Sequence, residues 1–135
     1  MTTLSFSVST IPVAWSRTRL ATSAFGKLRF VNAAALTEYE QQIAGEAAIA
    51  ATRAKWKMPA KDVPVSLTVQ FRLPIAESTG KRKRAAILGT SAVPSRGDLS
   101  NYVKAVEDGI VLAGCVIHDD AQITTITAEK RWCAP

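Results

Sequence analysis

Histidine, cysteine and long apolar runs are all scarce in this 135-residue sequence. No apolar run approaches the ~18 residues that a membrane-spanning helix needs. The first ten residues lack the basic start and the cleavage site of a signal peptide. We therefore expect a cytoplasmic protein with no membrane partner.

The scarce residues also exclude several kinds of site. Cys115 and Cys133 are too few and too far apart for a zinc site. We predict that both are small core residues in a reducing compartment. One histidine supports neither a Ser-His-Asp nor a Cys-His set, and there is no glycine-rich phosphate loop. No small-molecule cofactor is expected.

Acidic side chains are missing from residues 1–37, and Lys and Arg are missing from residues 105–129. The formal net charge of +6 points to a polyanionic partner, most simply nucleic acid. Residues 105–129 nevertheless hold five carboxylates. Like charges repel, and a bound divalent cation is one way to hold them together. Mg²⁺ suits such oxygen ligands and takes only one or two protein carboxylates.

The elements that are present predict a single α+β domain over residues 1–135, with a mixed β-sheet and two main helices. Alternating or continuous apolar residues predict strands over residues 3–9, 63–73, 115–117 and 122–132. The last strand breaks its pattern near Thr124-Thr125, as a β-bulge would. Apolar residues three and four apart predict helices over residues 36–56 and 98–113. Gly45 weakens the first helix by roughly 1 kcal/mol, and we expect it to mark a close crossing.

Two basic segments connect these elements. Residues 13–32 are predicted to form a loop, either solvated or contacting phosphates, with Trp15 or Phe25 as an apolar prop. Residues 74–97 carry the run Lys81-Arg-Lys-Arg84. A loop of this length inside a compact domain is usually functional or disordered. The run leads directly into the acidic stretch, which favours DNA contact over a solvated charge cluster.

Several candidate site residues also have ordinary structural explanations. Gly97-Asp98 before an apolar helix is typical of an N-cap. Lys104 and Asp108 have the spacing of a helix-surface ion pair worth a few tenths of a kcal/mol. Asp119-Asp120 is common turn chemistry. The order of these residues along the chain, more than any one of them, favours a metal-dependent nuclease site.

That order resembles the signature of RusA-type Holliday junction resolvases. The signature reads Arg-x-Asp-Leu-Asp-Asn, a Lys three residues later, an Asp four residues further, and then Asp-Asp-x-Gln-Ile/Val. The resemblance is strong over residues 96–131 and looser elsewhere, and its matching segments are Arg96-Gly-Asp-Leu-Ser-Asn-Tyr-Val-Lys104, Asp108-Gly109, His118-Asp-Asp-Ala-Gln-Ile123 and Lys130.

The resemblance implies a homodimer that cuts four-way DNA junctions by paired nicks with Mg²⁺, for which Mn²⁺ can substitute. Asp98 and Asp120 match family carboxylates that bind the metal and are essential for cleavage. Asp119 matches an acid beside them, and Lys104 matches a lysine needed for cleavage. The expected DNA-binding residues are all basic: Arg17, Arg19, Lys81, Arg82, Lys83, Arg84 and Arg96.

One position departs from the family pattern. Ser100 stands where the family has a second Asp, and a hydroxyl carries no charge for a metal. Three hypotheses therefore stay open: an active junction endonuclease, a catalytically impaired protein that binds branched DNA, and a globular domain whose basic surface is incidental. The resemblance implies that the side chains at positions 98 and 100 both reach the metal. Two side chains two positions apart point the same way only if the chain there is extended, so we expect the helix to begin near Ser100.

Overall fold

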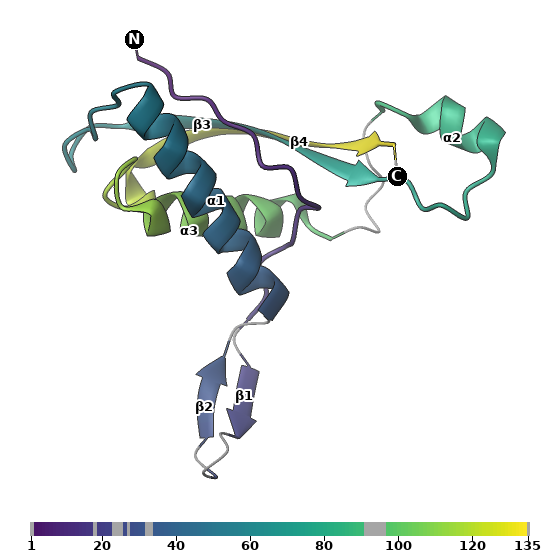
Figure 1. Cartoon of the computed structure of the whole chain (residues 1–135), viewed down its shortest axis with the longest axis horizontal. Helices are drawn as coiled ribbons and strands as arrows, with labels where there is room; N and C mark the ends of the chain where they lie inside the picture. Colours follow the sequence, from purple (N-terminus) through teal and green to yellow (C-terminus); the bar gives the residue numbers. More distant parts are fainter. Residues whose placement is uncertain are drawn as a thin grey trace.

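The computed structural model describes residues 2–17, 19–22, 26, 28–31, 34–90 and 97–134. Its elements, in chain order, are β1 (Arg19–Thr22), β2 (Leu28–Val31), α1 (Ala34–Arg53), β3 (Val65–Pro74), α2 (Lys81–Ile87), α3 (Leu99–Ala113), the 3-10 helix η2 (Asp120–Gln122) and β4 (Ile123–Cys133). The helices α1 and α3 cross against one face of the β3–β4 sheet, and α2 projects beyond the end of that sheet (Figure 1). The α+β class predicted from the sequence is confirmed.

The strands β3 and β4 lie parallel to each other. A parallel pair needs a crossover connection, and the segment that contains α2 and α3 provides it. Val65 pairs with Ile123, but Ser66 pairs with Thr125, so Thr124 is an extra residue. The predicted bulge is confirmed. Alternation along β3 buries Phe71 and directs the polar residues between its apolar ones outward.

The helices α1 and α3 form where the apolar spacing predicted them. The buried residues of α1 recur on one stripe: Leu36, Tyr39, Ile43, Ala47 and Ala51. The buried face of α3 includes Val103, Val106 and Ile110. Gly114 ends α3 in a left-handed conformation with φ of 73°, which favours glycine because a side chain would be strained there. These two helices and the inner face of the sheet make up the core.

The close crossing of α1 and α3 occurs at Gly109, so the prediction for Gly45 was wrong. A Cβ atom added to Gly109 would lie 2.8 Å from two side-chain carbons of Ile43. Gly45 is exposed and has no neighbouring atom within 4 Å of such a Cβ. The helical pattern shows which face of a helix is buried, but the point of contact depends on the partner helix.

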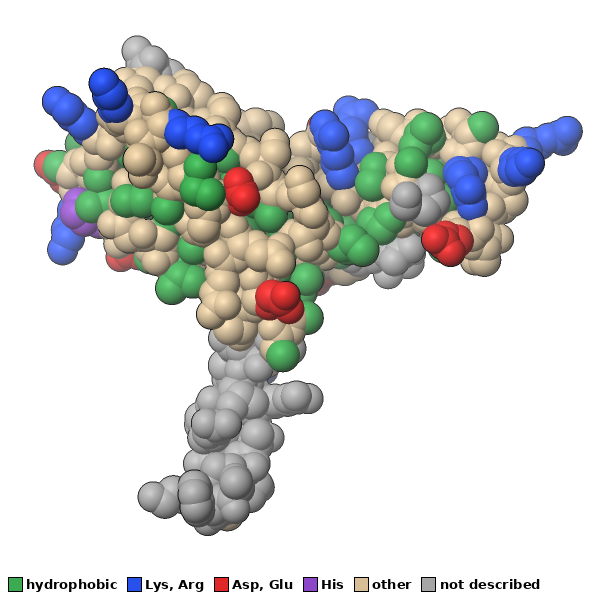
Figure 2. Space-filling view, in the orientation of Figure 1, with side chains coloured by type: hydrophobic (Ala, Val, Ile, Leu, Met, Phe, Trp, Pro, Cys, Tyr) green, Lys and Arg blue, Asp and Glu red, His purple; other side chains and the backbone are tan. Residues whose placement is uncertain are grey.

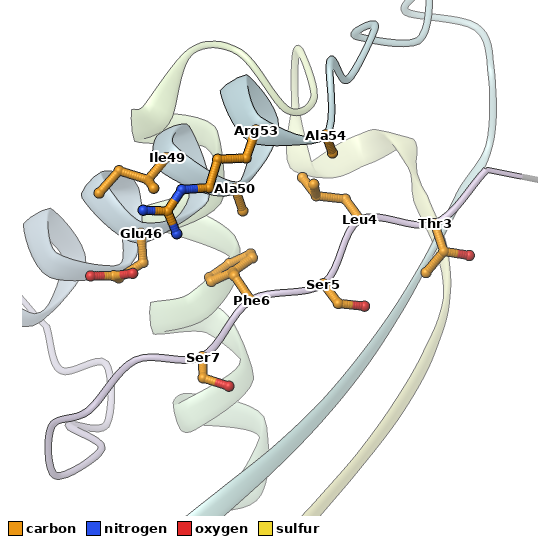
Figure 3. A pocket seen from close by; sticks show the side chains of 10 residues that line it. All are labelled: Thr3, Leu4, Ser5, Phe6, Ser7, Glu46, Ile49, Ala50, Arg53 and Ala54. Carbon is orange, nitrogen blue, oxygen red and sulfur yellow. The ribbon is translucent and has the colours of Figure 1, made fainter.

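Two predicted strands are absent. Residues 3–9 have the expected alternation, with Leu4, Phe6 and Val8 half-buried, but they form no β-ladder. They pack against α1 beside a shallow groove, where Figure 3 shows Leu4 and Phe6 next to Ala50. Residues 115–117 are likewise not a strand, although Ile117 is buried. Alternation and apolarity report burial, whereas a strand also needs a hydrogen-bonding partner.

Two short elements lie where the sequence predicted loops. The strands β1 and β2 form an antiparallel hairpin within residues 13–32. The helix α2 lies within residues 74–97. None of its residues is buried, so no apolar stripe is needed to pack it against the core, and the pattern used to predict helices is missing there. In place of the predicted mixed sheet, the described strands form one parallel pair and one antiparallel hairpin.

Both cysteines are unpaired and half-buried. Cys115 packs against the core as predicted, whereas Cys133 lies at the end of β4 and lines a groove. Of the helices in the described part of the chain, none is both long and apolar enough to cross a membrane.

Candidate active site

Asp98 occupies the N-cap position of α3 in an extended conformation. Its backbone carbonyl accepts hydrogen bonds from the amides of Asn101 and Tyr102, at 3.0 and 3.2 Å. Its carboxylate makes no capping bond and is exposed. An N-cap role therefore accounts for the backbone of Asp98 and leaves its side chain free for chemistry. The helix begins one residue before Ser100, close to the predicted start.

Lys130 fixes the turn before Asp98. Its ammonium donates a 2.7 Å hydrogen bond to the carbonyl of Gly97, across 33 residues of sequence. Gly97 has φ of 96°, which favours glycine, and the ring of Tyr102 lies against it. Lys130 belongs to the matched signature, but the sequence assigned it no role.

Lys104 is held from two sides on the surface of α3. Its Nζ lies 3.8 Å from a carboxylate oxygen of Asp108, which confirms the predicted ion pair. It also lies 5.2 Å from the centre of the Trp15 ring, within cation–π range. The amide of Trp15 donates a 2.9 Å hydrogen bond to the carbonyl of Asn101. The N-terminal segment therefore anchors on α3 and helps to place Lys104, a contact that sequence spacing could not indicate.

Asp119 and Asp120 lie at the start of η2 with their carboxyl groups in contact. Asp119 is the N-cap, and its carboxylate accepts a hydrogen bond from the amide of Ala121 at 3.4 Å. A hydrogen bond between the two side chains lowers the pKa of Asp119 and raises that of Asp120. Two carboxylates this close repel each other, which disfavours the charged form of Asp120.

Gln122 holds this acidic turn in place. This residue is only 4% exposed. Its Oε1 accepts hydrogen bonds from the amides of His118 and Asp119, at 2.7 and 3.3 Å. Its Nε2 donates to the carbonyls of Ala60 and Val63, at 2.9 and 3.2 Å. Gln122 thus ties the turn to the segment before β3. The sequence signal was the Gln of the Asp-Asp-x-Gln motif, which we had not given a function.

Further acids surround Lys104. Burial and then the charge of Asp120 raise the pKa of Glu107, whereas Lys104 lowers it. Burial and then Asp108 raise the pKa of Glu40, and Lys104 again opposes this. Glu40 reaches the group because α1 crosses α3 at Gly109. We call these acids the acid cluster, in which four act on or with Lys104 and Asp119 joins through Asp120: Glu40, Glu107, Asp108, Asp119 and Asp120.

The structure does not bring Asp98 into the acid cluster of its own chain. The helix α3 is 15 residues long, or about 22 Å. Asp98 precedes this helix, and β4 starts beside its other end and runs back until Lys130 reaches Gly97. Figure 1 accordingly shows β4 beginning near the end of α3 that is remote from its start. Asp98 and Asp120 lie far apart within one chain.

The donor set at Asp119-Asp120 fits a divalent cation in part. Neither residue is buried, and a cation would relieve the repulsion between the two carboxylates. Mg²⁺ needs only one or two protein carboxylates when phosphate oxygens complete its shell. Among residues 2–17, 34–90 and 97–134, however, no group of three or more His, Cys, Asp or Glu side chains is close enough to hold a metal.

The predicted DNA-binding residues differ in their availability. Lys81, Arg82 and Lys83 are exposed on α2, and Arg17 is exposed near the N-terminus. The guanidinium of Arg84 instead donates to the backbone carbonyls of the loop before α2, at 2.7 and 3.2 Å. Arg84 therefore has a structural role in the projecting segment that carries α2, residues 75–90, which we call the α2 arm. Arg96 and the side chain of Arg19 lie outside the described residues.

Residues 10–134 match the protein-family model described as endodeoxyribonuclease RusA. No curated protein and no solved structure matches the chain.

Proposed function

Because this chain belongs to the RusA family of junction-resolving endodeoxyribonucleases, we propose that it cuts four-way DNA junctions by paired nicks with Mg²⁺ as cofactor. It would act in the cytoplasm, in recombination, repair or phage DNA processing, with residues 1–135 as one domain. The single observation that carries the proposal is the acid cluster around Lys104, set in the matched signature. An oxygen-rich site with one fixed ammonium suits the hydrolysis of a phosphodiester.

The proposed roles follow from the positions of the side chains. Asp119 and Asp120 would hold the cation together with phosphate oxygens of the DNA. When bound, the cation supplies stabilisation for the charge that develops on the phosphate. Lys104 would offset charge on that phosphate or on the leaving oxygen. Asp108 and Trp15 restrict the position of its ammonium, so the lysine is oriented before DNA binds.

We propose that the protein is a homodimer and that two chains complete each site. Asp98 and Asp120 of one chain lie toward opposite ends of α3. Two such helices packed antiparallel about a two-fold axis would bring Asp98 of the partner subunit near Asp120. Leu112, 57% exposed in the last turn of α3, offers an apolar contact for the second chain. A two-fold dimer also matches a two-fold junction.

Ser100 supports a second candidate function, the binding of branched DNA with weak cleavage. It is exposed in the first turn of α3 and brings no charge to Asp98. A Ser100→Asp variant should cut faster than the wild-type protein at low Mg²⁺, and the wild-type protein should prefer Mn²⁺. Equal rates in a metal titration would show that another acid already fills this position.

The proposal is tested by incubating the protein with a synthetic four-way junction and a matched linear duplex, with Mg²⁺ or with a chelator. Paired nicks that need metal and the junction support the enzyme. A junction-selective gel shift without cutting supports the second candidate. Asp120→Asn should abolish cutting and leave junction binding intact. Cutting at the wild-type rate by this variant would overturn the site assignment.

A further inference from the structure

The β3–β4 sheet with α2 differs in charge from the helices α1, α3 and η2. The β3–β4 sheet and α2, over residues 65–90 and 123–134, contain seven Lys or Arg and two Asp or Glu. The helices α1, α3 and η2, over residues 34–53 and 98–122, contain two Lys or Arg and eight Asp or Glu. Figure 2 shows one group of blue side chains over α2 and the adjoining end of the sheet, and a second group at the opposite end of the molecule. A polyanion would therefore meet attraction at the sheet and α2, and repulsion at the acid cluster.

The face of the β3–β4 sheet that points away from the helices is polar from Ser66 to Arg72 on β3 and from Thr125 to Arg131 on β4. We call it the outer sheet face, and its residues form four cross-strand pairs: Ser66 with Thr125, Thr68 with Thr127, Gln70 with Glu129, and Arg72 with Arg131. The opposite face carries the buried Phe71 and Leu73. The outer face offers hydroxyls, an amide and guanidinium groups, which are the side chains that most often contact DNA phosphates.

Arg72 and Arg131 stand directly opposite each other across the two strands. Like charges in this position destabilise a sheet. One carboxylate serves the pair: Glu129 accepts from Arg131 at 2.9 Å and from Gln70 at 2.6 Å. Gln70 in turn accepts from Arg72 at 3.2 Å. Two guanidinium groups thus share one acid, and an excess positive charge remains that an added anion would neutralise.

A groove of about 300 Å³ lies between this arginine pair and the base of α2. Arg72, Arg131, Gln70, Leu88 and Gly89 are among the residues that line it. Arg131 donates a 2.7 Å hydrogen bond to the carbonyl of Gly89. Backbone hydrogen bonds at 3.0 and 2.9 Å also join Gly89 and Thr90 to Trp132. The end of α2 nearest Gly89 is therefore fixed to the sheet. The exposed Lys81, Arg82 and Lys83 lie in the first turn of α2, at its other end.

We propose that this groove and the outer sheet face bind the phosphate backbone of a DNA arm, at a site separate from the acid cluster. The inference rests on the proposed function for the identity of the polyanion, but it does not require cleavage. Guanidinium groups recognise phosphate through two parallel hydrogen bonds, and this contact does not depend on base sequence. The groove would hold an arm of the junction while the acid cluster meets the branch point.

Arg72 is the residue to change, because its hydrogen bond runs to a single exposed side chain, that of Gln70. Arg131 also anchors Gly89, so its loss would disturb the α2 arm. A plot of log K for DNA binding against log salt has a negative slope. Arg72→Gln should make this slope less steep by about 0.9, for junction and duplex DNA alike. Arg53→Gln is the matched control. Arg53 is an exposed arginine at the end of α1, and it lines the other groove, the one between α1 and the N-terminal segment in Figure 3. The slope of this variant should equal that of the wild-type protein.

Binding is measured by fluorescence anisotropy in a chelator over a series of salt concentrations, with a thermal melt of each variant to confirm folding. If the salt slope of Arg72→Gln equals that of the wild-type protein, and the wild-type protein binds DNA, the proposal that this groove binds DNA is wrong. The proposed function is then unaffected. Equal losses for both variants show a general charge effect and also overturn it. A loss of dimer mass in Arg72→Gln by light scattering would assign the face to a second copy. Absence of DNA binding by the wild-type protein overturns both proposals.

Discussion

Gln122 satisfies four backbone groups with one side-chain amide, and all of them belong to the acidic turn or to the segment before β3. An apolar side chain of similar length would leave these groups without the partners they have in the buried site. We expect Gln122→Met to lower the free energy of unfolding by roughly 1–3 kcal/mol. We also expect slower cleavage, because Asp119 and Asp120 would lose their support.

Urea unfolding and single-turnover cleavage measure the two effects of Gln122→Met. Gln42→Met is the control, since Gln42 is exposed on α1 and its replacement should change neither quantity. Unchanged stability of Gln122→Met would show that the turn is supported by other contacts.

Tyr39 makes the stability of the fold depend on pH in the alkaline range. Burial, and then the neighbouring Tyr102, raises the pKa of Tyr39 from 10.0 to about 12. The folded state keeps the phenol proton after the unfolded state loses it, so this contribution is fully present below pH 10 and is lost as the pH rises from 10 to 12. Its size is roughly 2–3 kcal/mol.

The variant Tyr39→Phe should therefore lose less stability than the wild-type protein over this range. Unfolding free energies at a series of alkaline pH values provide the measurement. When tyrosine ionisation is followed by ultraviolet absorbance, the step at the highest pH should be missing in this variant, because that step belongs to Tyr39. A parallel fall in the stability of both proteins would contradict the assignment.

At the scale of the elements, the crossing of α1 and α3 depends on a glycine. Gly109→Ala would place a methyl group 2.8 Å from Ile43, and Glu40 lies at the same contact. Overpacking of this kind costs about 1–3 kcal/mol, which exceeds the gain of up to ~1 kcal/mol in helix propensity. Displacement of Glu40 and Asp108 should also reduce cleavage.

Gly45→Ala is the matched change on α1, because nothing lies within 4 Å of the added methyl group. It should stabilise the protein by roughly 0.5–1 kcal/mol through helix propensity alone. Thermal and urea unfolding of the two variants measure the contrast. Equal effects of both substitutions would place the helix crossing elsewhere.

At the scale of the whole molecule, the separation of Asp98 from Asp120 has a direct test. Asp98→Asn and Asp120→Asn should each be inactive as pure dimers. In a mixed dimer with shared sites, one site receives both mutations and the other receives none. Co-expressed chains with different tags should therefore recover single nicks without paired cuts.

Mn²⁺ binding by calorimetry gives a second readout, with one site recovered in each mixed dimer. For cutting, Asp120→Asn mixed with Lys104→Ala is the control, because Lys104 acts on Asp120 of its own chain and neither site of the mixed dimer would hold both residues. If the Asp98→Asn and Asp120→Asn mixture stays inactive, each chain builds its site alone.

Local patterns in the sequence were sufficient for the long elements and for the candidate residues. A helix repeats every 3.6 residues and a strand every two, so α1, α3, β3 and β4 could be predicted from their apolar spacing. The bulge at Thr124 broke the same pattern. The order of the signature residues led to the family, and it also identified Asp98, Lys104 and Asp120 as candidates.

Only the tertiary structure decided which distant residues meet. The helix α2 and the hairpin β1–β2 are too short, and α2 too exposed, to show a periodic pattern. The contacts of Trp15 with Lys104, of Lys130 with Gly97 and of Arg72 with Arg131 each join residues far apart in sequence. Such contacts depend on strand register and helix crossing, which are set by packing across the whole core rather than by any local repeat.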